Sequence, residues 1–253
     1  MGSHSRPSGH QPDRTGAVAR TRSQEEMADT QDDSAVDREW LVNQIAHALR
    51  NPIFAATVQT ESLQLRAKDP QAVLKTVESL HGQLQRLSTS IDEMLLFGRP
   101  IRASFEDVSV AEVLNSLATR YGNGDRQDPA EVTLVGVDEE LSGRWNRNTL
   151  VVILERILDN AVQHTDPPHE ILLAASVASD GNMVFTVSDR GTGISPEILE
   201  RATLPFFPQH CGRPGLGLAI ADKFARSLRG RIEIESLEGA GTVVRCILPM
   251  RAD

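Results

Sequence analysis

The fold of this chain is decided by residues 45–53, which read IAHALRNPI. Around this stretch apolar residues recur at spacings of four and three, with Gln59 in one slot; they are Val42, Ile45, Leu49, Pro52, Ala56 and Leu63. This spacing predicts a helix with a mostly apolar seam. His47 falls on the opposite side and Asn51 one turn later, so we expect both to face solvent. Pro52 removes a backbone donor and is expected to kink the helix.

A second helix is predicted over residues 71–97, because Lys68-Asp69-Pro70 breaks the first. Its apolar residues form a seam of about three heptads: Val73, Val77, Leu80, Leu84, Leu87, Ile91 and Met94. Two such helices joined by a short loop make a helical hairpin, which has too little core to stand alone. Two copies packed as a four-helix bundle bury both seams, so the pattern predicts a homodimer.

Composition limits the class of protein. The 253 residues are 40% hydrophobic and 24% charged, which is typical of one or two globular domains. The net charge of -9 gives a nucleic-acid role no electrostatic support. No apolar run approaches the ~20 residues of a membrane span, no signal peptide is visible, and Cys211 and Cys246 suggest neither a metal site nor a disulfide framework. We therefore expect a cytoplasmic protein without a membrane segment.

The predicted domains are three. Residues 1–36 are polar and are expected to be a disordered tail. Residues 37–100 hold the helical hairpin, and residues 101–253 hold a second domain of mixed helices and strands. Helices are predicted at 108–121, where Ser109 and Glu112 form a capping box, and at 148–164 and 216–228. Strands are predicted at 131–137, 170–177, 183–188, 231–237 and 242–248. Because regular βαβ alternation is missing, we expect an α+β sandwich, with helices on one face of a mostly antiparallel sheet.

Three features of the second domain suit ligand binding, although each has a plain structural alternative. Asn160, beside Asp159 at a helix end, offers oxygens to a hard cation or is simply the polar edge of a helix. Asp189, followed by Gly191 and Gly193, permits close approach of a flat polar ligand or is a strand-to-helix turn. Residues 212–218, GRPGLGL, lead into a helix N-terminus that can cradle an anion. They match neither a Walker A nor a Rossmann fingerprint.

In their order along residues 38–250, these features resemble the sensor histidine kinases of two-component signalling. Residues 47–52, HALRNP, look like the phosphoacceptor box of that family, and residues 204–207, LPFF, look like the phenylalanine box of its ATP lid. The resemblance implies a dimerising domain that carries the histidine, followed by a Bergerat-type ATP-binding domain.

The resemblance also implies roles for individual residues. His47 is the phosphoacceptor, and Asn51 matches the position that orients water for dephosphorylation of the response regulator. Asn160 holds Mg²⁺, and Asp189 accepts from the adenine amino group of ATP. Binding roles are also implied at Gly191, Gly193, Gly215 and Gly217, with Arg213 as a candidate phosphate contact. The implied partner is the receiver domain of a response regulator.

The sequence departs from the family pattern at several positions. Ala48 stands where an acidic residue usually follows the phosphoacceptor, so no base is supplied there. Arg156 and Gln163 replace a common Asn and a common basic residue, and Arg213-Pro214 replaces Gly-Thr. Two alternatives therefore stay open. One is a kinase-impaired dimeric scaffold, phosphatase or phosphotransfer adaptor. The other is a DNA-topology or chaperone ATPase, which needs a carboxylate base for which Glu155 is one residue out of register.

Overall fold

The computed structural model describes residues 42–63, 69–101, 104–122, 130–207 and 214–251. Its contacts divide the chain into two compact units, Met1–Arg50 and Asn51–Asp253. The described part of the first unit, residues 42–50, is helical, and the second unit opens with helical residues 51–63. The predicted tail, residues 1–36, and the candidate Arg213 lie outside the described residues.

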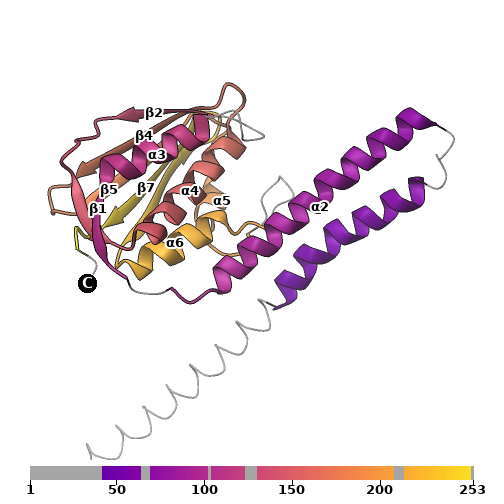
Figure 1. Ribbon diagram of the computed structural model, residues 1–253, viewed down its shortest axis with the longest axis horizontal. Helices are drawn as coiled ribbons and strands as arrows, with labels where there is room; N and C mark the ends of the chain where they lie inside the picture. The colour runs from indigo at the N-terminus through magenta and orange to yellow at the C-terminus, as the bar shows by residue number, and fades with distance from the viewer. Residues whose placement is uncertain (1–41, 64–68, 102–103, 123–129, 208–213, 252–253) are drawn as a thin grey trace, which may run out of the picture. The chain divides into compact units, whose positions relative to one another are not determined.

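The second predicted helix is α2, Pro70–Gly98. Asp69 caps it, since its carboxylate accepts from the N–H groups of Gln71 and Ala72 at 3.1 and 3.3 Å. Pro70, which was predicted to belong to the break between the two helices, thus lies in the first turn of α2. A proline is tolerated there because its missing N–H would have no partner within the helix. Gln59 Nε2 donates to Ser79 Oγ at 2.9 Å, so residues 51–63 and α2 lie side by side as a helical hairpin (Figure 1).

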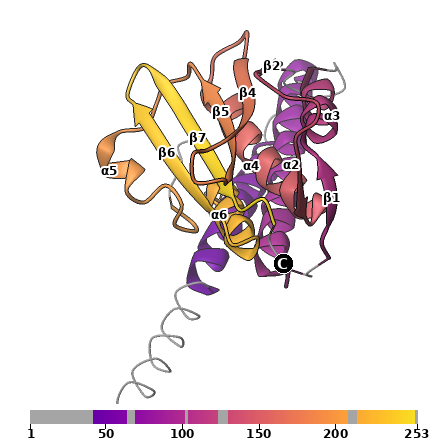
Figure 2. The same cartoon turned by 90° about the vertical axis from the view of Figure 1, so that its left-hand side faces the viewer.

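The remainder of the second unit is an α+β sandwich. Its elements, in chain order, are β1 (Glu106–Ser109), α3 (Val110–Gly122), β2 (Glu131–Val135), β3 (Ser142–Trp145), α4 (Arg147–His164), β4 (Glu170–Val177), β5 (Met183–Asp189), α5 (Pro196–Leu199), α6 (Gly217–Ser227), β6 (Arg231–Leu237) and β7 (Gly241–Leu248). Five strands pair in the order β2-β4-β5-β7-β6, and β1 pairs with β3. Among the pairs of these described strands, β2–β4 is parallel and the others are antiparallel. The helices α3, α4 and α6 pack on one face of the large sheet (Figure 2).

Alternating burial along the strands fixes which face of the sheet carries the core. In β5, Met183, Phe185 and Val187 are buried, while the residues between them are half-buried. The facing stripe of α4 is buried throughout and consists of Leu150, Ile153, Leu154, Ile157, Leu158 and Ala161. The predicted architecture, a helical region followed by an α+β sandwich, is therefore confirmed.

The small sheet β1–β3 was not predicted from the sequence. The helix expected from residue 108 starts at Val110, because residues 106–109 pair with β3. Ser109 nevertheless caps this helix as expected, since its Oγ accepts from the Glu112 N–H at 3.3 Å. Trp145 ends β3, is fully buried, and donates its indole N–H to the Pro249 carbonyl at 2.7 Å. Among the described residues, no helix combines the length and the apolar character needed to cross a bilayer.

Candidate functional site

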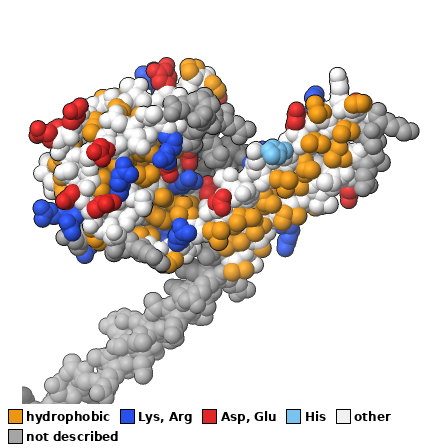
Figure 3. Space-filling model, viewed as in Figure 1, with side chains coloured by type: hydrophobic (Ala, Val, Ile, Leu, Met, Phe, Trp, Pro, Cys, Tyr) orange, Lys and Arg blue, Asp and Glu red, His pale blue; other side chains and the backbone are white. Residues whose placement is uncertain are grey.

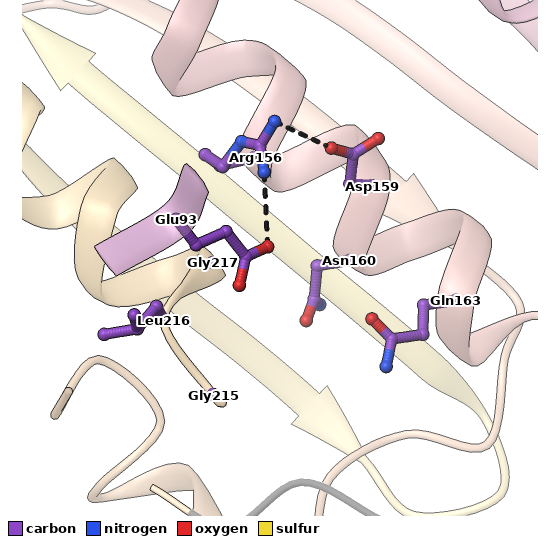
Figure 4. Close-up of a pocket in the computed structure, with 8 residues that line it drawn as sticks. All are labelled: Glu93, Arg156, Asp159, Asn160, Gln163, Gly215, Leu216 and Gly217. Carbon is purple, nitrogen blue, oxygen red and sulfur yellow. Dashed lines mark hydrogen bonds and ion pairs between the residues drawn. The ribbon is translucent and has the colours of Figure 1, made fainter. Parts of the chain in front are cut away.

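A pocket lies where α4 faces the start of α6 (Figure 4). Its cavity volume is about 30 Å³, and its lining comprises Glu93, Arg156, Asp159, Asn160, Gln163, Gly215, Leu216 and Gly217. Residues 156, 160 and 163 share one face of α4 because they are spaced by four and three. The structure thus brings the candidate residues Asn160, Gly215 and Gly217 together around one pocket.

The start of α6 presents backbone donors at this pocket. Its N-cap residue, Leu216, makes no side-chain capping bond, so within the described residues no N-cap side chain satisfies the first N–H groups of the helix. These groups and the positive end of the helix dipole attract an anion. Gly215 has φ +66°, and a Cβ there would lie 2.0 Å from the Phe207 carbonyl oxygen. Gly217 is not crowded, since its nearest neighbour, the Arg156 carbonyl oxygen, is 4.0 Å from a Cβ.

Arg156 is the cation of the pocket. Its Nη1 lies 3.4 Å from Glu93 Oε1, and its Nη2 lies 3.3 Å from Asp159 Oδ2. Its Nε is buried and has no hydrogen-bond partner in the described part of the chain. Glu93 was not predicted to belong to any site, because its only sequence signal is a carboxylate within the heptad helix. Arg156 was noted only as a departure from the family pattern.

Asp189 ends β5 and is buried. Its Oδ1 accepts from the N–H groups of Gly191 at 2.8 Å and Thr242 at 3.2 Å. Burial raises the pKa of this carboxyl, although those two hydrogen bonds act in the opposite direction. In the described part of the chain no donor reaches Oδ2, so the carboxylate retains an acceptor for a ligand N–H.

The glycines after Asp189 serve the backbone of the protein itself. A Cβ at Gly191 would lie 2.0 Å from the His164 carbonyl oxygen, and one at Gly193 would lie 2.1 Å from that of Leu237. The Thr192 N–H donates to the same His164 carbonyl at 3.0 Å. Close backbone packing is therefore one reason for these glycines, and the ligand-related role expected of them stays a prediction. This packing attaches the Asp189 segment to the end of α4, about one helical turn beyond Asn160.

The other candidate residues lie elsewhere. His47 and Asn51 are exposed on the helix of residues 42–63, as their spacing predicted. His47 belongs to the first unit and Asn51 to the second. Glu155 does not line the pocket but pairs with Arg120, so it is not placed as the base that a topology or chaperone ATPase needs.

The donor set suits a metal-bound polyphosphate. Asn160, Asp159 and Gln163 supply side-chain oxygens of the kind that Mg²⁺ prefers. Within the described ranges no group of three or more His, Cys, Asp or Glu side chains is positioned to hold a metal ion. The pocket therefore fits a cation that a phosphate ligand would help to hold, together with backbone N–H groups for the phosphate itself.

Comparison with known proteins agrees with this geometry. Residues 146–252 match the family described as histidine kinase-, DNA gyrase B-, and HSP90-like ATPase. The signal transduction histidine-protein kinase AtoS of Escherichia coli (strain K12) is 28% identical over 214 residues, which are 81% of this chain and 34% of AtoS. The chain is thus similar to sensor histidine kinases. It spans about a third of the length of AtoS.

Two solved structures, one of them of the histidine kinase ThkA, show the same fold. One is ThkA in complex with the response regulator protein TrrA, with a TM-score of 0.73 and 21% identity, covering 91% of this chain and 66% of that one. Another is full-length ShkA in complex with AMPPNP, with a TM-score of 0.54 and 20% identity, covering 82% of this chain and 45% of that one. The helical region and the sandwich of this chain thus have the same fold as proteins of known structure.

Proposed function

We propose that this chain is the catalytic core of an ATP-dependent protein-histidine kinase of a two-component system. The observation that best supports this proposal is the pocket lined by Asn160, Gly215 and Gly217 at the start of α6, where the N-cap residue makes no side-chain capping bond. The pocket lies within the region that matches the histidine kinase-, DNA gyrase B-, and HSP90-like ATPase family. The buried carboxylate of Asp189 adds an acceptor for a base, and the segment that follows it is bonded to His164, one helical turn beyond Asn160 on α4.

The residues divide the work of nucleotide binding. Asp189 Oδ2 accepts from the adenine amino group, while Gly191 and Gly193 hold its segment against the neighbouring backbone. The N–H groups near Gly215 and Gly217 bind the phosphates, and Asn160 binds the Mg²⁺ that accompanies them. When bound, Mg²⁺ would neutralise phosphate charge as phosphoryl transfer proceeds. Arg213, in the lid, stays a prediction.

His47 is the proposed phosphoacceptor. Its imidazole nitrogen attacks the γ-phosphorus of ATP, ADP leaves, and the nitrogen loses its proton. The phosphoryl group then passes to an aspartate on the receiver domain of a response regulator. Asn51, exposed on the same helix, orients water for the reverse control step, dephosphorylation of the regulator. The ThkA–TrrA complex supports the choice of partner, and a cytoplasmic setting suits it.

We also propose that the kinase is a homodimer through residues 37–100. Large apolar side chains stay exposed along the hairpin (Figure 3). Exposed members within the second unit are Ile53, Phe54, Val58, Leu74, Val77, Leu84, Ile91 and Leu95. An apolar surface of this kind marks an interaction site, and three of these residues belong to the predicted heptad seam.

Ala48 makes the forward reaction slow in this proposal, because a positioned base contributes about 10²–10⁴-fold in rate. Ala48→Glu is expected to raise the rate of labelling from γ-labelled ATP, provided that its carboxylate lies near the imidazole. A time course of both proteins at equal ATP is the measurement. Equal rates would mean that the base comes from elsewhere and would discard the slow-kinase reading.

The test of the whole proposal is incubation with γ-labelled ATP and Mg²⁺, followed by acid treatment. We expect acid-labile label on the wild type and none on His47→Gln, because phosphohistidine hydrolyses in acid. Ser90→Ala is the control variant, since it removes a side chain of the same hairpin without touching the acceptor. ATP binding in calorimetry together with no labelling of the wild type would favour the scaffold alternative. If calorimetry detects no ATP binding, the proposed nucleotide site is wrong.

A further inference from the structure

An ion pair between Glu93 of α2 and Arg156 of α4 links α2 to the pocket. The family resemblance gives neither residue a role. The buried side chains of α2 are those of Ser90 and Glu93, whereas Leu84 and Ile91 of the same helix are exposed. Burying a carboxylate is unfavourable unless it is paired, so this arrangement needs a specific partner. The partner is Arg156, and both side chains line the pocket (Figure 4).

The pairing leaves Arg156 only loosely satisfied. Its two contacts, 3.4 Å to Glu93 and 3.3 Å to Asp159, are longer than the 2.7–2.9 Å typical of a charge-assisted N–H···O bond. Its buried Nε has no hydrogen-bond partner among the described residues. A planar guanidinium with an unused donor suits a bidentate anion such as a phosphate better than it suits these two carboxylates.

Glu93 is the residue that α2 contributes to the pocket lining. The cavity volume of about 30 Å³ is comparable to the space for a water molecule. Because Glu93 enters from α2 while the other lining residues come from α4 and the start of α6, undocking of α2 would enlarge the pocket without unfolding the sandwich.

A second contact holds the same end of α2. Lys223 of α6 donates to the carbonyls of Phe97 and, at 3.3 Å, of Arg99, and its ammonium lies 5.1 Å from the centroid of the Phe97 ring. Glu93 is one helical turn before Phe97, so the two contacts form one docking surface on α4 and α6.

We infer that Arg156 is a phosphate-binding residue and that Glu93 is an internal anion that takes the place of the phosphate. Docking of the α2 end and binding of the nucleotide triphosphate then exclude each other. This inference rests on the proposed ATP site and deepens it. A phosphoanhydride ligand recruits Arg156 only by breaking its pair with Glu93, so the apparent affinity for ATP is lowered by the fraction of docked molecules.

The experiment measures binding of ATP and of adenosine to the full chain by titration calorimetry in Mg²⁺ buffer. Glu93→Gln is expected to tighten ATP binding by about tenfold, since the docked state loses its ion pair. Adenosine, which has no phosphate, should change far less. Glu93→Gln/Arg156→Gln should bind ATP at least about tenfold more weakly than Glu93→Gln alone, because the double variant lacks the proposed phosphate contact.

The matched controls are Glu78→Gln, an exposed glutamate of α2, and Arg120→Gln, an arginine that pairs with Glu155 outside the pocket. Both should leave ATP binding unchanged. The double variant removes the Glu93–Arg156 pair as a whole, so Glu93 is not left as a buried carboxylate without its arginine, as it would be in Arg156→Gln alone. Hydrogen exchange gives a second readout: ATP should speed exchange around residues 90–98 of the wild type.

The outcomes separate the inference from the proposed function. If the wild type binds ATP and Glu93→Gln binds it equally well, the exclusion is wrong while the ATP site stands. If the double variant binds ATP as tightly as Glu93→Gln, Arg156 only tethers α2 and has no phosphate role. If neither the wild type nor Glu93→Gln binds ATP, the proposed function fails and this inference fails with it. Binding by Glu93→Gln alone supports the exclusion in its strongest form.

Discussion

The helix α2 and the sandwich bury opposite kinds of side chain. The buried stripe of α4 is apolar and packs on the sheet, whereas α2 buries Ser90 and Glu93 and leaves Leu74 63%, Leu84 52% and Leu95 67% exposed. The sandwich completes its hydrophobic core within one chain, but the hairpin does not. The stability of the sandwich should therefore be independent of protein concentration, while that of the hairpin should depend on association.

The largest effect is expected inside the sandwich. Trp145→Ala removes a fully buried ring that packs edge-on against Phe185, with the two ring centroids 5.9 Å apart. This substitution should lower the free energy of unfolding by about 3–5 kcal/mol. Leu172→Ala, at a residue 44% exposed on β4, is the control and should cost far less. Urea denaturation, monitored by far-ultraviolet circular dichroism so that the signal does not depend on tryptophan, measures the unfolding free energy of both variants. Equal losses would show that burial does not rank these sites.

The hairpin should break at its seam. Leu84→Asp places a charge in the proposed dimer interface and should weaken association by about 2 kcal/mol or more, the range of interface hot spots. Gln85→Asp adds the same charge at the neighbouring exposed position and should leave the dimer intact. Light scattering measures the mass. A wild-type mass equal to the 27.7 kDa of one chain would contradict the dimer and the contrast between the two regions.

Within the sandwich, Asp189 should separate stability from binding. Burial raises its pKa, so the folded state favours the neutral acid, and this residue contributes stability below its unfolded pKa that is lost as pH rises through the folded pKa. Asp189→Asn should thus not lower the melting temperature at neutral pH, since its amide oxygen can still accept from Gly191 and Thr242. ATP binding should nevertheless weaken by about 1.5 kcal/mol.

The pH dependence of binding sharpens this prediction. In the wild type, ATP affinity should fall as pH drops through the raised pKa, because the protonated carboxyl loses its acceptor strength toward the adenine amino group. In Asp189→Asn the fall of ATP affinity due to this carboxyl should be absent, and only the pH dependence caused by titration of the nucleotide should remain. Calorimetry over an acidic pH series compares the two proteins. Identical pH profiles would remove Asp189 from the adenine contact.

The smallest effect concerns the start of α2. Asp69→Ala removes the cap on two backbone N–H groups and should lower hairpin stability by about 1 kcal/mol, the usual value for a lost cap. Asp92→Ala, an exposed position inside α2, is the control. Thermal unfolding at two protein concentrations should show the loss in the hairpin transition. A loss confined to the sandwich transition would contradict the assignment.

Periodic patterns made most of the fold predictable. The helices α2, α4 and α6 and the strands β4 to β7 lie within two residues of the predicted bounds, because each has a clear apolar period. The small sheet was missed, since β3 reads Ser-Gly-Arg-Trp and is defined by its pairing with β1 rather than by its own pattern. A Cβ at Gly143 would lie 2.1 Å from the Trp145 ring, so this glycine serves packing that no local signal reveals.

The site was predictable where glycines and polar residues follow one another along the chain. Asn160, Gly215 and Gly217 meet as expected, but the pair of Glu93 and Arg156 joins residues 63 positions apart. In the heptad helix Glu93 is an ordinary polar position, and only the tertiary arrangement turns it inward. The glycines after Asp189 were identified for a ligand-related reason, whereas their neighbours are backbone carbonyls. Close packing of backbone against backbone produces no characteristic pattern in the sequence, so it could not be predicted.

The strand β6 closes one edge of the large sheet, and three of its four exposed side chains are charged, the exception being Leu237. Arg231, Glu233 and Glu235 alternate with half-buried residues, and Glu235 pairs with Arg245 of β7 at 2.6 Å. An open strand edge is a template for adding strands from other molecules, and charged side chains discourage that addition. This edge should therefore resist the growth of β-aggregates when the protein is concentrated, and self-association is directed to the helical hairpin instead.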